Sequence, residues 1–188
     1  ADLNMKIPEN GISAYSGKIA TNGFNIGSFL NASQLGIVTA NTKIKGRGFS
    51  LKNLNANVDA TVKRFDFNGY SYQNAIVNGD FDKQLFKGHL SIDDPNLKIS
   101  GLDGALNIST KQIAFNLNAD VAKANLKSLL LTNDNLSLSG LFSLNFTGNN
   151  IDNFLGTARI NDATLKHDST KLSFDSLTLK SEFLENKK

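Results

Sequence analysis

The residues that could carry out chemistry are few and far apart in this sequence. The two histidines, His89 and His167, each lie in a stretch with the alternation of a β-strand, and no ligand motif surrounds either one. No nucleophile with a nearby base and no pair of carboxylates has the spacing that general acid–base chemistry needs. The sequence contains no cysteine, which excludes a disulfide framework and a thiolate metal site. We therefore predict that the protein is not an enzyme and needs neither a metal nor a cofactor.

Two oxygen-rich segments could offer ligands to Ca²⁺, but neither has the spaced acidic residues and terminal glutamate of a calcium-binding loop. They are Asp93-Asp94-Pro95-Asn96 and Asn133-Asp134-Asn135, and both are typical of turns. The net charge is only +3 and the basic residues are scattered along the chain. A sequence pI near 9.1 therefore does not predict binding to nucleic acid.

The strongest pattern in the sequence is an alternation of apolar and polar side chains that recurs from one end to the other. It predicts β-strands with one apolar and one wet face, because successive side chains of a strand point to opposite sides. Shifting such a strand by one residue would bury asparagine, aspartate and lysine without partners, so the register is well specified. The alternation places nine apolar residues on inward faces: Leu54, Val58, Val62, Ile113, Phe115, Leu117, Leu138, Phe142 and Leu144.

Short turn signals divide the alternation into antiparallel hairpins. They are Asn10-Gly11, Asn22-Gly23, Asn68-Gly69, Asn78-Gly79 and Asp103-Gly104. Two segments, near residues 26–32 and 121–131, break the alternation and are predicted to be short helices. The predicted fold is therefore mainly β, with antiparallel hairpins that form either an elongated curled sheet or a sandwich. The alternation does not distinguish an open groove from a closed sandwich, because both need one buried and one wet face.

The two predicted helices also reveal an internal repeat of roughly one hundred residues. Each is followed by strands and then by a shared tripeptide, Asp59-Ala60-Thr61 in the first half and Asp162-Ala163-Thr164 in the second. We predict one β repeat over residues 1–104 and another over residues 105–188, which can together form one continuous domain. Because the chain starts abruptly at Ala1 and ends just after a strand-like segment, we expect it to be a piece or a mature part of a longer protein.

The assembled segments resemble the AsmA-like and TamB (translocation and assembly module) family, most of all its members from Bacteroidetes-type bacteria. The likeness covers most of the sequence and consists of strand and turn patterns without a catalytic signature. Its segments are Phe24-Asn25-Ile26-Gly27-Ser28-Phe29-Leu30 with Leu35-Gly36, Gly69-Tyr70-Ser71-Tyr72-Gln73-Asn74 leading to Gly79, Gly88-His89-Leu90-Ser91-Ile92-Asp93-Asp94-Pro95-Asn96-Leu97, Ala119-Asp120-Val121 with Ala124-Asn125-Leu126, and the stretch from Phe146-Thr147-Gly148 to Ile160-Asn161.

This resemblance implies a large envelope-spanning protein, anchored in the inner membrane by an N-terminal helix, whose β-rich periplasmic body forms an elongated β-taco-like groove. It implies a role in phospholipid transport towards the outer membrane and in outer-membrane biogenesis, with outer-membrane assembly proteins as further partners. The chain would be one segment of that body, and membrane contact would come from other parts of the full-length protein. The nine inward residues would then line a hydrophobic groove for phospholipid acyl chains. The alternative is a non-catalytic β-sandwich adhesion module that binds protein or glycan on its outer surface.

Overall fold

The computed structural model describes residues 1–30, 33, 35–50, 53–107, 114–147 and 155–182. In these residues the chain forms one short helix, α1 (Ile26–Leu30), and eleven β-strands. The strands are β1 (Asp2–Lys6), β2 (Ala14–Asn25), β3 (Leu35–Arg47), β4 (Asn55–Phe67), β5 (Tyr70–Asp82), β6 (Leu85–Asp93), β7 (Leu97–Asn107), β8 (Ala114–Asn125), β9 (Leu136–Thr147), β10 (Leu155–His167) and β11 (Thr170–Ser181). The predicted mainly β fold is therefore confirmed.

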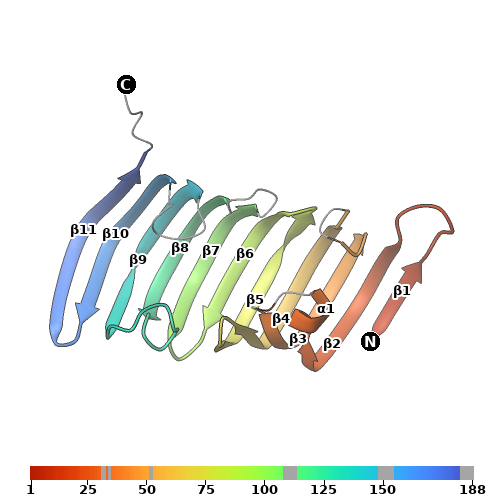
Figure 1. Ribbon diagram of the computed structural model, residues 1–188, viewed down its shortest axis with the longest axis horizontal. Helices are drawn as coiled ribbons and strands as arrows, with labels where there is room; N and C mark the ends of the chain where they lie inside the picture. The colour runs from red at the N-terminus through yellow and green to blue at the C-terminus, as the bar shows by residue number, and fades with distance from the viewer. Residues whose placement is uncertain (31–32, 34, 51–52, 108–113, 148–154, 183–188) are drawn as a thin grey trace.

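All eleven strands belong to one antiparallel sheet whose spatial order is the order of the sequence (Figure 1). The sheet is not closed, and β1 and β11 form its two edges. Of the two forms that the sequence left open, the structure adopts the elongated sheet. The strands can be long because the only two prolines, Pro8 and Pro95, lie in connections, so no strand loses a backbone donor to proline. In Figure 1 the turns after β2, β4, β6, β8 and β10 form the lower border of the sheet.

The first predicted helix is present as α1 at the lower border, where it lies against β3. Asn25 caps it, because the Asn25 side-chain oxygen accepts a hydrogen bond of 2.9 Å from the backbone N–H of Ser28. This arrangement satisfies one of the backbone donors that a helix start leaves unpaired. The prediction of this helix rested on the break in the alternation, and the structure adds the Asn25 cap.

The second predicted helix, residues 121–131, is wrong. Residues up to Asn125 belong to β8, and residues 126–131 form a single tight turn, which we call the β8–β9 turn. Asn125 caps this turn through the N–H of Ser128 at 3.1 Å, as Asn25 caps α1. However, the N–H of Leu131 bonds to the carbonyl of Leu126 at 2.9 Å, and Leu130 has a φ of 61°. This is the bonding of a helix C-terminus, so the helix ends after one turn.

Three of the five predicted hairpin turns lie inside strands. Asn68-Gly69 does form the tight turn between β4 and β5, and Asn10-Gly11 lies in the connection after β1. Asn22-Gly23, Asn78-Gly79 and Asp103-Gly104 instead lie within β2, β5 and β7. At these positions glycine serves close packing or a bulge, and the chain does not reverse.

Bulges occur at nearly the same level across much of the sheet. Register shifts separate Thr21 from Phe24 in β2, Val121 from Ala124 in β8 and Asn161 from Thr164 in β10. At each bulge, two residues lie between successive inward-facing side chains, where a regular strand has only one. Because a bulge bends its strand and increases the local twist, a line of bulges bends the whole sheet along its length.

The sheet runs without interruption across the boundary predicted between Gly104 and Ala105, which lies inside β7. The duplication stays a prediction. One structural recurrence agrees with it, because the asparagine caps at Asn25 and Asn125 lie one hundred positions apart and each accepts a bond from the serine three residues later.

Candidate functional site

The inward face of the sheet carries apolar rows that run across all or nearly all of its strands. Each row joins the residues that face one another from strand to strand. The central row consists of Leu3, Gly17, Ile44, Val58, Gly79, Gly88, Gly104, Leu117, Leu144, Ala158 and Leu179. The aromatic row above it consists of Met5, Tyr15, Gly46, Ala56, Phe81, Phe86, Leu106, Phe115, Phe146, Gly156 and Ser181.

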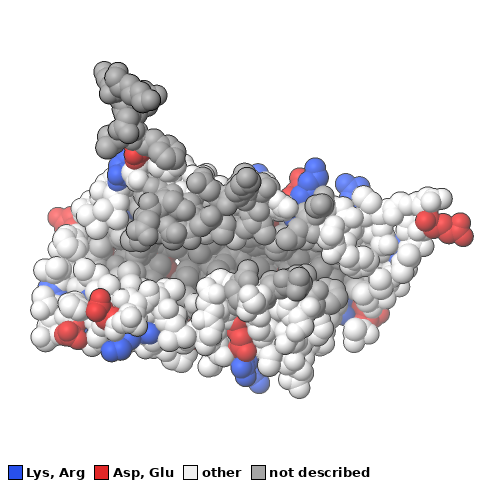
Figure 2. Space-filling model, in the orientation of Figure 1, with Lys and Arg blue, Asp and Glu red and all other residues white. Residues whose placement is uncertain are grey.

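A third row lies below the central one and consists of Ile19, Thr42, Ala60, Val77, Leu90, Leu102, Ala119, Phe142, Ile160 and Leu177. None of the residues in the three rows is charged. With a spacing of about 4.8 Å between neighbouring strands, eleven strands give rows of about 48 Å. This is roughly three times the thickness of one hydrocarbon leaflet, which is about 15 Å. Figure 2 shows this side of the molecule hollowed along its long axis, and we call the hollow the trough.

The pattern of burial shows that the trough is not a sealed core. Among the described residues, eight of the twelve buried apolar residues are alanines, such as Ala60 and Ala119. Larger neighbours on the same face shield them. The larger side chains of the central row, including Val58, Leu117 and Leu144, are only partly buried. No described side chain is fully buried. A sandwich would bury the large side chains first, because they would meet the opposite sheet.

The total accessible surface leads to the same conclusion. The chain exposes 12680 Å². A compact monomer of its mass, 20.3 kDa, would expose about 8,800 Å². The difference is roughly 3,900 Å², as expected for a single-layer sheet whose two faces are both accessible to solvent.

One section of the trough is covered by a second layer of side chains. Leu129 of the β8–β9 turn is only 3% exposed and belongs to a cluster with Ile99, Val121 and Ala124. Tyr70, Tyr72 and Phe142 are among the partly buried residues packed against this cluster. We call this region the covered section, and the part of the three rows outside it the open section.

A buried carboxylate holds the lower border of the covered section together. Asp94, 4% exposed, accepts hydrogen bonds from the Tyr70 hydroxyl at 2.6 Å, from the Gln73 N–H at 3.0 Å and from the Asn96 N–H at 2.8 Å. Burial, followed by the hydrogen bond to Asp94, raises the pKa of Tyr70, and burial raises the pKa of Tyr72. Every oxygen of this carboxylate has a partner, so it joins β5 to the β6–β7 turn and is not a free chemical group.

The register places seven of the nine predicted inward residues on the trough side, whereas Leu54 lies in a connection and Ile113 lies outside the described residues. Val58, Leu117 and Leu144 lie in the central row, Phe115 in the aromatic row and Phe142 in the row below. Val62 and Leu138 lie lower on the same face. Leu54 is partly buried in the connection that precedes β4.

Sequence reasoning missed the glycine stretch of the central row. Gly79, Gly88 and Gly104 are direct neighbours on β5, β6 and β7, and the ring of Phe86 lies over the first two. A Cβ at Gly79 would lie 2.6 Å from that ring, and a Cβ at Gly104 would lie 2.4 Å from the carbonyl oxygen of Asn116. The sequence did contain a signal for this stretch. The apolar alternation continues both before and after Gly79 and Gly104, which places these glycines on the apolar face.

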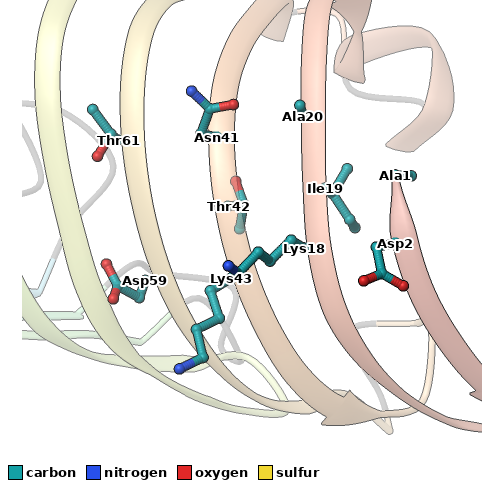
Figure 3. A pocket seen from close by; sticks show the side chains of 10 residues that line it. All are labelled: Ala1, Asp2, Lys18, Ile19, Ala20, Asn41, Thr42, Lys43, Asp59 and Thr61. Carbon is teal, nitrogen blue, oxygen red and sulfur yellow. The ribbon is translucent and has the colours of Figure 1, made fainter.

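The opposite face of the sheet is polar. One depression on it, with Lys18, Lys43 and Asp59 among its lining residues, has a volume of about 600 Å³ and is shallow (Figure 3). In it, Asp2, Lys18, Lys43 and Asp59 follow one another as direct neighbours from β1 to β4. Asp2 with Lys18 and Lys43 with Asp59 are neighbours of opposite charge, whereas Lys18 and Lys43 are like charges side by side. The row offers no nucleophile with a base.

Several other ionisable groups on the surface form pairs. His89 lies 2.9 Å from Asp103, and both side chains are exposed. Arg64 bonds to Asp66 at 2.8 Å, and this hydrogen bond is the main cause of a lowered pKa for Asp66. In the described part of the chain, no group of three or more histidines, aspartates or glutamates is arranged to hold a metal ion.

Comparisons with protein-family models, with curated proteins and with solved structures found no match to this chain. Among the described residues, no helix has the length and apolar character needed to cross a membrane.

Proposed function

We propose that this chain is a segment of an envelope-spanning protein of the AsmA-like and TamB type, and that its trough holds phospholipid acyl chains. The observation that supports this most is the burial pattern, in which alanines are covered while the larger apolar side chains of the rows remain partly exposed to water. A face of this kind gains free energy when an apolar chain covers it, and it needs no catalytic group to do so.

The energetics favour a long flexible chain as the occupant. Each methylene group removed from water contributes about 0.8 kcal/mol, so ten methylenes contribute about 8 kcal/mol before the cost of immobilising the chain. The three rows contain no charged side chain that could neutralise a phosphate. The headgroup must therefore stay at a border of the trough in contact with water, because burying an unpaired charge is costly.

The cellular setting follows from the resemblance of the sequence and is part of the proposal. The segment would lie in the periplasm and contribute to lipid transport and outer-membrane biogenesis. Other parts of the full-length protein would provide the inner-membrane anchor and the contacts with outer-membrane assembly proteins.

Native mass spectrometry with lipid extraction tests this proposal. The chain, purified without detergent, should carry phospholipid. Val58→Asn, which places an amide in the central row, should reduce the bound lipid at least several-fold. Asp59→Asn, the same new side chain on the opposite face, should leave it unchanged. Circular dichroism verifies that both variants are folded.

Absence of phospholipid from the folded chain, or equal loss in the two variants, would contradict the proposal. Either result would favour a module that binds protein or glycan on its outer face.

A further inference from the structure

Four of the predicted turn signals are asparagine–glycine pairs, and a pair of this kind can react with itself. The pairs are Asn10-Gly11, Asn22-Gly23, Asn68-Gly69 and Asn78-Gly79. The backbone nitrogen of the glycine attacks the side-chain carbonyl carbon of the asparagine, and glycine allows this because it has no Cβ to restrict the backbone. All four asparagines are exposed to solvent. Exposure therefore does not decide which pair reacts, and the restraints on each glycine N–H do.

The fold restrains three of these pairs against the attack. Gly79 has register partners on both β4 and β6, so its N–H lies within the hydrogen-bond ladder. The N–H of Gly23 donates a hydrogen bond of 3.0 Å to the Thr39 hydroxyl. Asn68 has a φ of 48° in the tight turn between β4 and β5, and closing a five-membered ring from this conformation needs a rotation that would break the turn. Each of the three pairs must therefore open locally before it can react.

The Asn10-Gly11 pair has none of these restraints. It lies in the connection of residues 7–13 between β1 and β2. Within the part of the chain that the structure describes, Gly11 has no strand partner and its N–H donates no hydrogen bond. The Gly11 nitrogen can therefore approach the Asn10 side chain without breaking a contact. The rate of an intramolecular reaction depends on how easily the two reacting atoms reach this near-attack geometry.

We propose that Asn10 is a site of spontaneous deamidation and that the fold protects the other three pairs. The Gly11 nitrogen loses its proton to water or hydroxide and forms a bond to Cγ of Asn10. The bond from Cγ to Nδ2 breaks, and ammonia leaves. Water then opens the resulting succinimide ring at either carbonyl carbon. Opening at Cγ gives aspartate, whereas opening at the main-chain carbonyl carbon gives isoaspartate, so water is the only other reactant.

The reaction changes the connection between β1 and β2 in two ways. Either product places a new carboxylate there and lowers the net charge of the chain by one. Isoaspartate also adds a methylene group to the backbone, because the chain then runs through Cγ of residue 10. Neither Asn10 nor Gly11 belongs to the three apolar rows, so the inference does not depend on what the trough holds.

Peptide mapping by mass spectrometry, after incubation in a mildly alkaline buffer, tests the proposal. In the folded chain, Asn10 should convert at least about tenfold faster than Asn22, Asn68 or Asn78, because each of these must first open locally. In the chain unfolded in urea, all four asparagines should convert at similar rates, since glycine follows each of them and no fold restrains it.

Two variants test the reacting atoms and the protection separately. Asn10→Gln keeps the amide but lengthens the side chain, so conversion at residue 10 should almost disappear while the other three sites stay unchanged. Thr39→Val removes the acceptor of the Gly23 N–H, so conversion of Asn22 should rise several-fold while that of Asn10 stays constant. Circular dichroism verifies that both variants are folded.

Three results would overturn the proposal. They are equal conversion of the four pairs in the folded chain, a pair other than Asn10-Gly11 that converts first, and a conversion of Asn10 that folding slows as strongly as it slows the other three. Unchanged conversion of Asn22 in folded Thr39→Val would contradict the explanation of its protection.

Discussion

The covered and open sections of the trough belong to the same sheet but bury their side chains differently. In the covered section Leu129 reaches back over the strands and packs with Ile99 and Val121, so the sheet has a second layer there. In the open section Val58 and Leu144 have no described segment packed over them and stay partly exposed. The difference indicates that folding stability is concentrated in the covered section. The open section retains unused apolar surface, which is the property that a binding site needs.

The largest expected effect comes from truncating the same residue type in the two sections. Leu129→Ala removes a side chain that is 97% covered and leaves a cavity, so the free energy of unfolding should fall by about 3 kcal/mol. Leu144→Ala removes a partly exposed side chain and should cost about 1 kcal/mol. Urea unfolding of both variants measures this difference. Equal losses would show that the open section is packed as well as the covered one.

A second pair of variants tests how closely neighbouring strands approach in the open section. In Gly104→Ala the new Cβ would lie 2.4 Å from the backbone oxygen of Asn116, so the strands must move apart at a cost of about 2 kcal/mol. In Gly101→Ala, on the same strand, the nearest atom is the end of the exposed His89 side chain at 3.3 Å. The melting temperature should fall for Gly104→Ala and stay nearly constant for Gly101→Ala. A similar fall in melting temperature for both variants would mean that the change in strand flexibility, and not the contact with Asn116, lowers the stability.

The smallest expected effect tests the strain in the segment that covers the trough. Leu130 adopts a left-handed conformation that costs a side chain with a Cβ about 1 kcal/mol. Leu130→Gly should therefore be about 1 kcal/mol more stable than Leu130→Ala, since both variants lose the exposed leucine but only glycine relieves the strain. Thermal unfolding of the pair measures it. Equal stability of the two variants would show that the conformation of Leu130 is not strained.

The strand positions and the apolar face could be predicted because the alternation depends only on neighbouring residues. Val58, Leu117 and Phe142 face inward as their local pattern indicates. The error at residues 121–131 arose because a break in the alternation does not distinguish a helix from a single capped turn. The ending at Leu130 requires a leucine with positive φ, which no propensity predicts. The misplaced turns arose for a related reason, since Asn78-Gly79 and Asp103-Gly104 are close-packing positions in the two strands that flank β6.

The openness of the trough could not be predicted from the sequence. Whether a second layer covers the sheet depends on packing between segments that are far apart in the chain. The local alternation is the same in a sandwich and in a single sheet. The line of bulges was equally hidden, because register depends on the neighbouring strand as well as on the strand itself.

The central claim is that the open section of the trough holds phospholipid acyl chains. Photo-crosslinking in cells tests it most directly, with a photo-reactive residue placed in the central row at Val58 or Leu144. The next residue of each strand, Asp59 or Asn145, points to the polar face and provides the matched control. We predict phospholipid adducts from both inward positions and far fewer from both outward ones. Adducts within the protein alone at Val58 and Leu144, or lipid adducts equally frequent on the two faces of a folded chain, would contradict the claim.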